Sequence, residues 1–384
     1  MNLGYCCINT ELQSKGIFTS RGMRKATFEY EGLDYVSELS IKNLTDLLII
    51  LKWNVANNIF NFRISSELFP WGFTYDITTL PQYNKIDELL KEIGNYVKSN
   101  NIRVTFHPSH FNVLGSNNPL TVEKTIKELN HHNQIFDLMG LEANPYYCIN
   151  IHIATTKPSK EIVAQQFCDN FQKLNINTQK RLTVENDDSV TQWSVLDLYN
   201  LIYKNIEIPI VFDEYHFLLG PQDQTMHEAF TTACSTWKVK PLIHLSSCRR
   251  IEDLQARIEA HADFIYEQPD NFEVEIDVDL ECKMKEQGVL QLRKQWNNLP
   301  KVSDMSVAKR LLEMNKRDPN RKKWGEALGF FPISLSLTIK KGDNIELKTG
   351  EEGVITKYSS NSIIHVKTSS DILVVEKNQI KRVI

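Results

Sequence analysis

Eight short apolar runs, each followed by a helical pattern, constrain this chain more than any other feature of its sequence. The runs are rich in β-branched and aromatic residues, which is typical of buried parallel strands. Strands that alternate with helices eight times favour a closed TIM (β/α)8 barrel over an open sheet. The runs read LGYCCIN (3–9), NFRISSELFP (61–70), IRVTF (102–106), YCINIHI (147–153), RLTVE (181–185), PIVFD (209–213), PLIHL (241–245) and IDVDLEC (276–282).

Helical patterns fill the connections between these runs. One face of the segment 41–57 carries Leu44, Leu47, Leu48 and Leu51, which is the spacing of an amphipathic helix. Further helices are predicted near 83–99, 121–139, 160–174, 191–204 and 224–236, and one that runs through Leu290 and Leu292.

The composition and the hydrophobic pattern of the sequence change near residue 301. A basic helical stretch comes first, and from residue 335 short alternating strands are separated by glycine turns. We therefore predict three parts: a barrel over 1–300, a basic helical linker over 301–334, and a small SH3-like β-barrel over 335–384.

Composition excludes several classes of protein. The chain has no apolar stretch of about 18 residues and no cationic, apolar leader, so we expect a soluble intracellular protein without membrane contact, cytoplasmic or nuclear. Its seven cysteines show no CxxC spacing, which indicates reduced thiols instead of disulfides or a cysteine zinc site.

Charge is divided unevenly along the chain. Residues 301–384 carry 16 Lys and Arg against 10 Asp and Glu, which leaves 28 against 38 for residues 1–300. A basic tail suits an anionic polymer such as nucleic acid, although a solvated charged face gives the same composition. The C-terminal part is therefore predicted to bind either DNA or protein.

Histidines and carboxylates occur where the apolar runs give way to polar sequence. The C-terminal ends of barrel strands meet at one face, so these side chains are expected to converge there. Such a set suits Mn or Zn, and a cluster of ions can catalyse in-line displacement at phosphorus. Sugar isomerases use two metals on the same barrel, so ligands and fold alone leave the reaction open. The residues are His107, His110, His152, Glu185, Asp213, His216, His244, His261 and Glu281.

A succession of motifs resembles the ultraviolet-damage endonuclease family over about residues 1–296. The motifs are FRISSELFPWG, FHPSHF, INIHI, TVENDD, FDEYH, IHLSS and LECKMKEQG, in that order. The resemblance implies a TIM barrel related to endonuclease IV that nicks duplex DNA immediately 5′ of pyrimidine dimers, (6-4) photoproducts and some abasic sites, without a nucleotide cofactor. It also implies three divalent ions, with Mn preferred over Zn or Mg.

Carried over position by position, the resemblance assigns the metal ligands. Glu185 would bridge two ions, His216 and His261 would hold the third, and Glu185, Asp213 and Glu281 would form the catalytic carboxylates. The complete set is His107, His152, Glu185, Asp213, His216, His244, His261 and Glu281.

The family's DNA-contacting residues are matched less closely. Its probing Gln-Tyr pair corresponds here to His110 and Phe111, which keep a hydrogen-bonding side chain and a stackable ring. His110 is therefore interpreted as a probing residue in preference to a ninth ligand. Tyr5 and Asn9 match positions that contact damaged nucleotides, with a packed Tyr and a turn Asn as the alternative.

Two further positions bear on the site. Lys283 is a candidate phosphate contact, or else a solvated lysine. Well-studied members of the family carry a modified lysine near the metals where this chain has Leu242, which puts the geometry or affinity of the third ion in question.

The resemblance predicts a monomeric enzyme whose partner is damaged double-stranded DNA. Alternatives are a general abasic-site endonuclease, a sugar isomerase, and a catalytically silent protein that binds damaged DNA. Metal content and nicking assays on dimer-containing, abasic and undamaged duplexes separate these alternatives.

Overall fold

The computed structural model describes residues 1–221, 223–253, 255–301, 344–347, 352–358, 363–369, 372–376 and 380–383. The chain divides into two compact units: one contains Met1–Cys248 and resumes at Ile258, and the other contains the C-terminal sheet. The predicted helical linker and the boundary near residue 300 fall on or beside residues 302–343, outside the described residues. These limits stay predictions.

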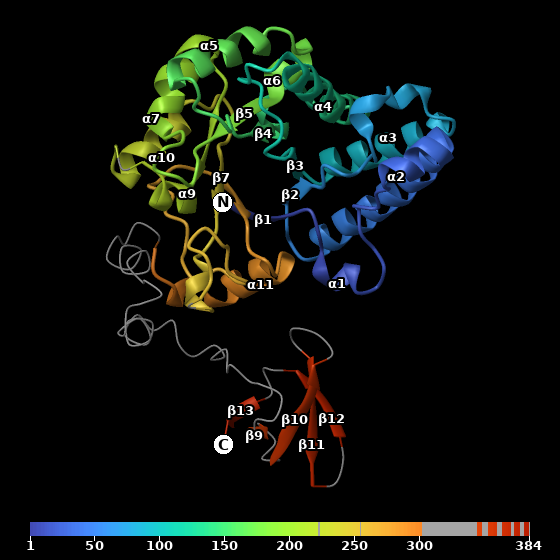
Figure 1. Cartoon of the computed structure of the whole chain (residues 1–384), viewed down its shortest axis with the longest axis vertical. Helices are drawn as coiled ribbons and strands as arrows, with labels where there is room; N and C mark the ends of the chain where they lie inside the picture. Colours follow the sequence, from blue (N-terminus) through green and yellow to red (C-terminus); the bar gives the residue numbers. More distant parts are fainter. Residues whose placement is uncertain are drawn as a thin grey trace. The chain divides into compact units, whose positions relative to one another are not determined.

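The first unit is a closed barrel of eight parallel strands, as the alternation of apolar runs predicts (Figure 1). Each strand pairs with its neighbours in sequence, and the last strand pairs with the first to close the barrel. Every predicted run contains an observed strand or most of one. The strands are β1 (Asn2–Cys6), β2 (Asn61–Ile64), β3 (Arg103–Phe106), β4 (Ile149–Ile151), β5 (Leu182–Glu185), β6 (Ile210–Asp213), β7 (Leu242–Leu245) and β8 (Asp277–Leu280).

Helices surround the barrel and bury their apolar faces against it. In α3 (Tyr83–Ser99) the buried residues Ile86, Leu90, Ile93 and Val97 repeat every three or four positions, which places them on one stripe. Gly94 lies where a Cβ atom would overlap the carbonyl oxygen of Met139, so this position requires a glycine. Among the described residues, the other α-helices of more than four residues are α4 (Pro119–Leu138), α5 (Lys160–Phe171), α6 (Ile176–Arg181), α9 (Glu214–Leu219), α10 (Met226–Ser235) and α11 (Glu286–Gln295), besides α2 described below.

Two connections differ from the predicted helices. The helix expected over 41–57 extends back to Lys25 in α2 (Lys25–Ala56), because Gly32 adopts a φ of +64° and joins a preceding helix across a kink. The helix expected over 191–204 begins at α7 (Val195–Leu198), continues as a π-helical turn over Tyr199–Tyr203 and ends in α8 (Lys204–Ile206). Shorter helices are α1 (Thr10–Gln13), η1 (Gly72–Thr74), η2 (Ile77–Thr79), η3 (Pro145–Tyr147), η5 (Arg249–Ile251) and η6 (Trp296–Asn298).

The C-terminal unit contains an antiparallel sheet of five strands in the order β12-β11-β10-β9-β13. Consecutive strands pair from β9 to β12, and β13 returns to pair with β9. Ile345, Leu347, Ile355 and Val366 are buried, as expected for the inner face of a small β domain. The strands are β9 (Asn344–Leu347), β10 (Glu352–Tyr358), β11 (Ile363–Thr368), β12 (Ile372–Glu376) and β13 (Ile380–Val383).

The predicted fold class is confirmed: a TIM barrel with a separate small antiparallel β domain. Among the residues that the structure describes, no helix combines the length and the apolar character that crossing a membrane requires.

Candidate metal centre

The barrel encloses polar residues on alternate strand positions. Because side chains alternate across a strand, Asn61 and Arg63 on β2 share the face of the sheet opposite to Phe62 and Ile64. On β8, Asp277 and Asp279 alternate in the same way with apolar residues and are fully buried. Bulky apolar residues dominate the usual filling of such barrels, so the buried polar side chains set this interior apart.

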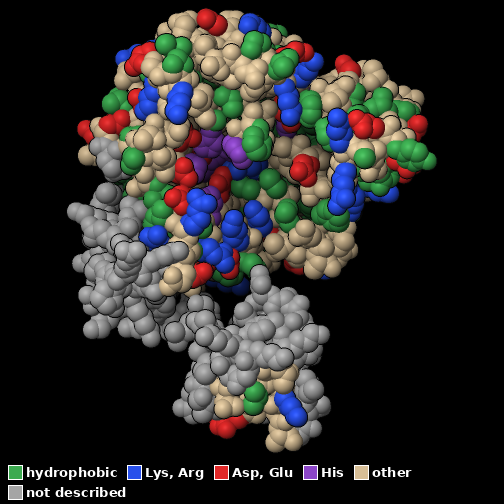
Figure 2. Space-filling model, viewed as in Figure 1, with side chains coloured by type: hydrophobic (Ala, Val, Ile, Leu, Met, Phe, Trp, Pro, Cys, Tyr) green, Lys and Arg blue, Asp and Glu red, His purple; other side chains and the backbone are tan. Residues whose placement is uncertain are grey.

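The predicted ligands lie at the C-terminal ends of the strands, as expected. Glu185 ends β5 and Asp213 ends β6, His244 lies within β7, and Glu281 directly follows β8. His107 and His152 follow β3 and β4. Figure 2 shows histidine side chains gathered in one patch on a face of the molecule, with acidic and basic side chains beside it.

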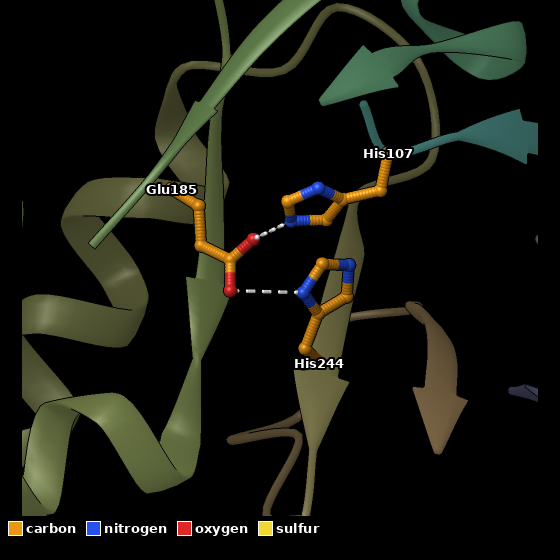
Figure 3. Close-up of side chains that lie close together, drawn as sticks. All are labelled: His107, Glu185 and His244. Atoms are coloured by element: carbon orange, nitrogen blue, oxygen red, sulfur yellow. Dashed lines mark hydrogen bonds and ion pairs between the residues drawn. The ribbon is translucent and has the colours of Figure 1, made fainter. Parts of the chain in front are cut away.

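Glu185 occupies the centre of this cluster. Its Oε2 atom lies 3.0 Å from Nε2 of His107, and its Oε1 atom lies 3.1 Å from Nδ1 of His244 (Figure 3). His216 and His152 approach the same carboxylate at 3.2 Å and 3.8 Å. One carboxylate thus faces histidines from four parts of the chain, which is the arrangement needed to bridge two ions.

Three overlapping groups of side chains have the spacing of metal sites, with their ligand atoms within 4.8 Å of one another. Glu185 belongs to two of these groups, and His244 also belongs to two. His261 belongs to none of them, although its Nδ1 atom lies 3.7 Å from Oε2 of Glu281. The groups are His107, Glu185 and His244; His152, Glu185 and His216; and Asp213, His244 and Glu281.

Four of the five histidines are oriented through Nδ1 by the protein. His107, His216 and His261 donate from Nδ1 to the backbone carbonyls of Pro108, Asn186 and Glu281, at 2.8–3.1 Å. His152 donates from Nδ1 to Oδ1 of Asp187 at 2.7 Å. Because Nδ1 carries the proton in each ring, Nε2 is left as the metal-binding atom.

Opposite charges favour the ionised form of two carboxylates of the cluster, Glu185 and Glu281, whereas burial raises the pKa of Asp213. Burial opposes ionisation of Glu185, but the neighbouring histidines, His244 and His152 foremost, hold its pKa well below the usual range. Burial also opposes ionisation of Glu281, but Arg63 and His244 outweigh it and lower its pKa. Burial disfavours protonation of His152, yet Glu185 and Asp187 raise its pKa to about 9. Metal ions would therefore compete with protons for these rings.

The residues present fit divalent metal ions. Oε1 of Glu185, Oδ2 of Asp213 and Nδ1 of His244 are buried atoms without a hydrogen-bond partner, although Glu185 and His244 lie within ion-pair distance. Leaving buried polar atoms unpaired costs about 1–3 kcal/mol each, which coordination of a cation would offset. The mixed imidazole and carboxylate donors suit Mn or Zn.

Sequence reasoning missed several residues that contact the cluster. Arg63 donates to Glu281 and contacts His244, and Asn150 donates to Oε2 of Glu185 at 2.5 Å. Asp187 was within a quoted motif but had no role assigned to it. The alternation of Asn61 with Arg63 and of Asp277 with Asp279 is the signal that these side chains face the barrel interior.

The predicted DNA contacts divide into exposed and buried residues. Phe111 is 73% exposed, and its ring centroid lies 4.1 Å from that of His110, which is also exposed. Tyr5 is fully buried and donates to Asn54, while Asn9 donates to the Tyr5 hydroxyl and caps α1. Tyr5 and Asn9 thus have structural partners, and their contact with DNA stays a prediction.

Lys283 and Leu242 also lie where the barrel geometry places them. Lys283 is exposed just beyond β8, two residues after the predicted ligand Glu281. Leu242 is buried within β7, two residues before His244, and pairs in register with Asp277. Its side chain offers no ligand atom, so the cluster here consists of histidines and acidic residues alone.

Comparisons with known proteins agree with this site. Residues 1–312 match the family model described as UV-endonuclease UvdE. A protein of Acanthamoeba polyphaga mimivirus is 31% identical over 310 residues, which cover 76% of this chain and 90% of that protein. The UV-damage endonuclease of Schizosaccharomyces pombe is 30% identical over 315 residues, 77% of this chain and 50% of that protein. The matched region thus accounts for only half of the yeast protein.

A solved structure shows the same similarity in three dimensions. The crystal structure of SacUVDE is 32% identical to this chain and superposes with a TM-score of 0.66. The match covers 78% of this chain and 100% of the SacUVDE chain.

Proposed function

The chain belongs to the UV-endonuclease UvdE family, and we propose that it is a metal-dependent endonuclease that nicks duplex DNA immediately 5′ of ultraviolet photoproducts. As a member of this family, it is an endonuclease of DNA repair. The finer proposal covers pyrimidine dimers and (6-4) photoproducts, with abasic sites as further substrates.

The observation that carries the proposal is the position of Glu185 among four histidines, with an unpaired oxygen on the buried carboxylate. Glu185 would bridge two ions, and the proposed ligands at the strand ends would complete their coordination. Asp213 and Glu281 form a further ligand-spaced group with His244. His216 and His261, whose ring centroids lie 6.3 Å apart, would hold a third ion.

Divalent cations bound there, Mn above Zn or Mg, would supply the Lewis acidity that activates water and offsets negative charge at the phosphate. The protein's own contribution is to position them. Asp187 and the backbone carbonyls fix the histidine rings, and Asn150 holds one oxygen of Glu185 through a hydrogen bond that Thr183 orients in turn. These contacts would keep the ligands at fixed positions relative to a reacting phosphate.

Lesion recognition is assigned to the exposed residues beyond the barrel strands. Phe111 presents a ring that can stack in a distorted duplex, His110 supports it, and Lys283 would contact phosphate. An enzyme that reads a damaged base must splay it out of the stack, which distorted duplexes allow at lower cost.

The test is an incision assay on three matched duplexes that contain a cyclobutane dimer, an abasic site or no lesion. We expect nicks 5′ of the dimer, their loss with chelator, and recovery with added Mn²⁺. Nicking of the abasic duplex alone would favour a general abasic-site endonuclease, and binding without nicking would favour a silent damage-binding protein.

We also propose that the C-terminal part of the chain contacts DNA. Its net basic composition differs from that of the barrel region. Truncation near residue 300 is expected to leave turnover at saturating DNA in place while weakening affinity, and the slope of log affinity against log salt falls by about 0.9 for each lost phosphate contact. Filter binding at several salt concentrations measures this. An unchanged slope would assign the part to protein binding or folding.

A further inference from the structure

Arg63 places a permanent positive charge inside the proposed metal centre. Its guanidinium donates from Nη1 to Oε1 of Glu281 at 2.6 Å, and Nη2 lies 2.7 Å from Nε2 of His244. Its Nε atom lies 3.4 Å from Oδ2 of Asp279, whose other oxygen accepts from Asn61. The side chain is only 9% exposed, so these contacts take place out of water.

The contact with His244 has a chemical consequence. A guanidinium has only donors, so Nε2 of His244 must be the acceptor in this hydrogen bond. The hydrogen of the neutral ring then lies on Nδ1, the atom that faces Glu185 and Glu281 at 3.1 Å and 3.5 Å. His244 is thus the exception among the five histidines, because the protein holds its ring through Nε2 and not through Nδ1.

A metal ion at the Asp213, His244 and Glu281 group needs the lone pair of Nδ1. Binding there would move the ring hydrogen to Nε2, where it would point at the donors of Arg63. His244 therefore cannot coordinate the ion through Nδ1 and accept the hydrogen bond from Arg63 at the same time. The ion and Arg63 also share one ligand atom, because Oε1 of Glu281 already accepts from Nη1.

We propose that Arg63 is an internal counter-cation of the metal centre, which stabilises the metal-free barrel and lowers the affinity of the Asp213, His244 and Glu281 group for its ion. When that ion binds, Arg63 loses its hydrogen bond to His244 and keeps its ion pair with Asp279. Arg63 is a positioning residue, because it acts through ligands and touches no substrate. This inference rests on the proposed function, since it requires that the cluster binds metal.

The experiment compares full-length wild type with Arg63→Gln, using Mn²⁺ alone as the ligand. Thermal unfolding is measured after chelation and again with saturating Mn²⁺, and titration calorimetry gives the stoichiometry and each affinity. We expect the metal-free variant to melt at least about 5 °C lower, because Glu281 and Asp279 lose their partner. We also expect one equivalent of Mn²⁺ to bind about tenfold more tightly than in wild type.

Arg103→Gln is the matched control, because Arg103 is likewise a buried arginine inside the barrel but contacts Asp277 instead of the ligands. It is expected to lower the melting temperature without changing any Mn²⁺ affinity. In a second control, Asp279→Asn in the Arg63→Gln background removes one negative charge and should recover part of the lost metal-free stability.

Arg63→Lys keeps the proposal testable if Arg63→Gln does not fold. Lysine retains the charge but cannot reach Glu281 and His244 together, so tighter Mn²⁺ binding is again expected. Unchanged or weaker Mn²⁺ binding by the folded variants would overturn the role of Arg63. If wild type binds no Mn²⁺, the metal centre itself fails, and the role of Arg63 fails with it.

Discussion

The two ends of the barrel interior both bury charged residues, but they satisfy them differently. At the N-terminal end, both oxygens of Asp277 have partners: Asn2 and Lys240 contact Oδ1, and Arg103 contacts Oδ2. At the C-terminal end, Glu185 and Asp213 each keep an oxygen without a hydrogen-bond partner. A paired carboxylate stabilises the fold, whereas an unpaired one is available to a ligand.

The pairing at the N-terminal end extends to Arg103. Its Nη1 atom donates to the backbone oxygen of Lys240 at 2.9 Å, and its guanidinium lies over the rings of Tyr146 and Trp237. Only its Nε atom is without a hydrogen-bond partner. The same kinds of residue thus build a structural network at one end and a candidate reaction centre at the other.

The largest expected effect comes from the C-terminal end of the barrel interior, where carboxylate oxygens lack hydrogen-bond partners. Glu185→Gln should lower nicking of a dimer-containing duplex by at least about a thousandfold, because an amide cannot bridge two cations. Binding of the same duplex should stay within about tenfold of wild type, since Glu185 is buried and the substitution leaves the exposed residues proposed to contact DNA unchanged. Single-turnover incision and gel-shift assays measure the two quantities. Turnover near wild type would remove the bridging role.

Substitutions at the N-terminal end of the barrel interior should change stability and leave activity unchanged. Asp277→Asn leaves Arg103 without a counter-charge and leaves Lys240 with only the exposed Glu275, so the free energy of unfolding should fall by about 3 kcal/mol. Urea denaturation gives this value, and a Mn²⁺ titration of the folded variant should match wild type. A change in the free energy of Mn²⁺ binding as large as the change in stability would show that the two ends are coupled and would contradict the comparison.

Asp187 tests how far metal binding at the C-terminal end depends on the residues that orient the histidine ligands. Asp187→Asn weakens the hydrogen bond that orients His152, so affinity for Mn²⁺ should fall by about 10- to 100-fold. Competition with a fluorescent chelator measures the change. Asp188→Asn is a suitable control, because the neighbouring carboxylate forms no ion pair with His152. An equal loss in both variants would point to general electrostatics.

Phe111 separates lesion recognition from the centre itself. Phe111→Ala should reduce the preference for damaged over undamaged duplex by about tenfold, while the rate at saturating DNA changes little, because stacking acts before the chemical step. Competitive binding with both duplexes reports the preference. Phe111→Tyr should keep it, and an equal preference in all three proteins would make this loop only structural.

The fold and most of the site could be predicted because both depend on local patterns. Apolar runs ending in His, Asp or Glu locate the strands and their C-terminal ends, and seven of the eight proposed ligands fall into the three metal-spaced groups. Arg63 and Asp279 were missed since a charged residue within a strand carries no mark of its partner more than 200 positions away. The burial of Tyr5 depends on Asn54, a contact that no local pattern encodes.

The anchoring of four histidine rings by backbone carbonyls and Asp187 has a consequence for how the proposed centre would acquire its ions. A ring held by such a hydrogen bond keeps its orientation whether or not an ion is bound, so little of the binding free energy is spent on ordering ligands. Exchange of one cation for another then requires no unfolding. We expect the cellular supply of metals, more than the folding history of the chain, to decide which ions it carries.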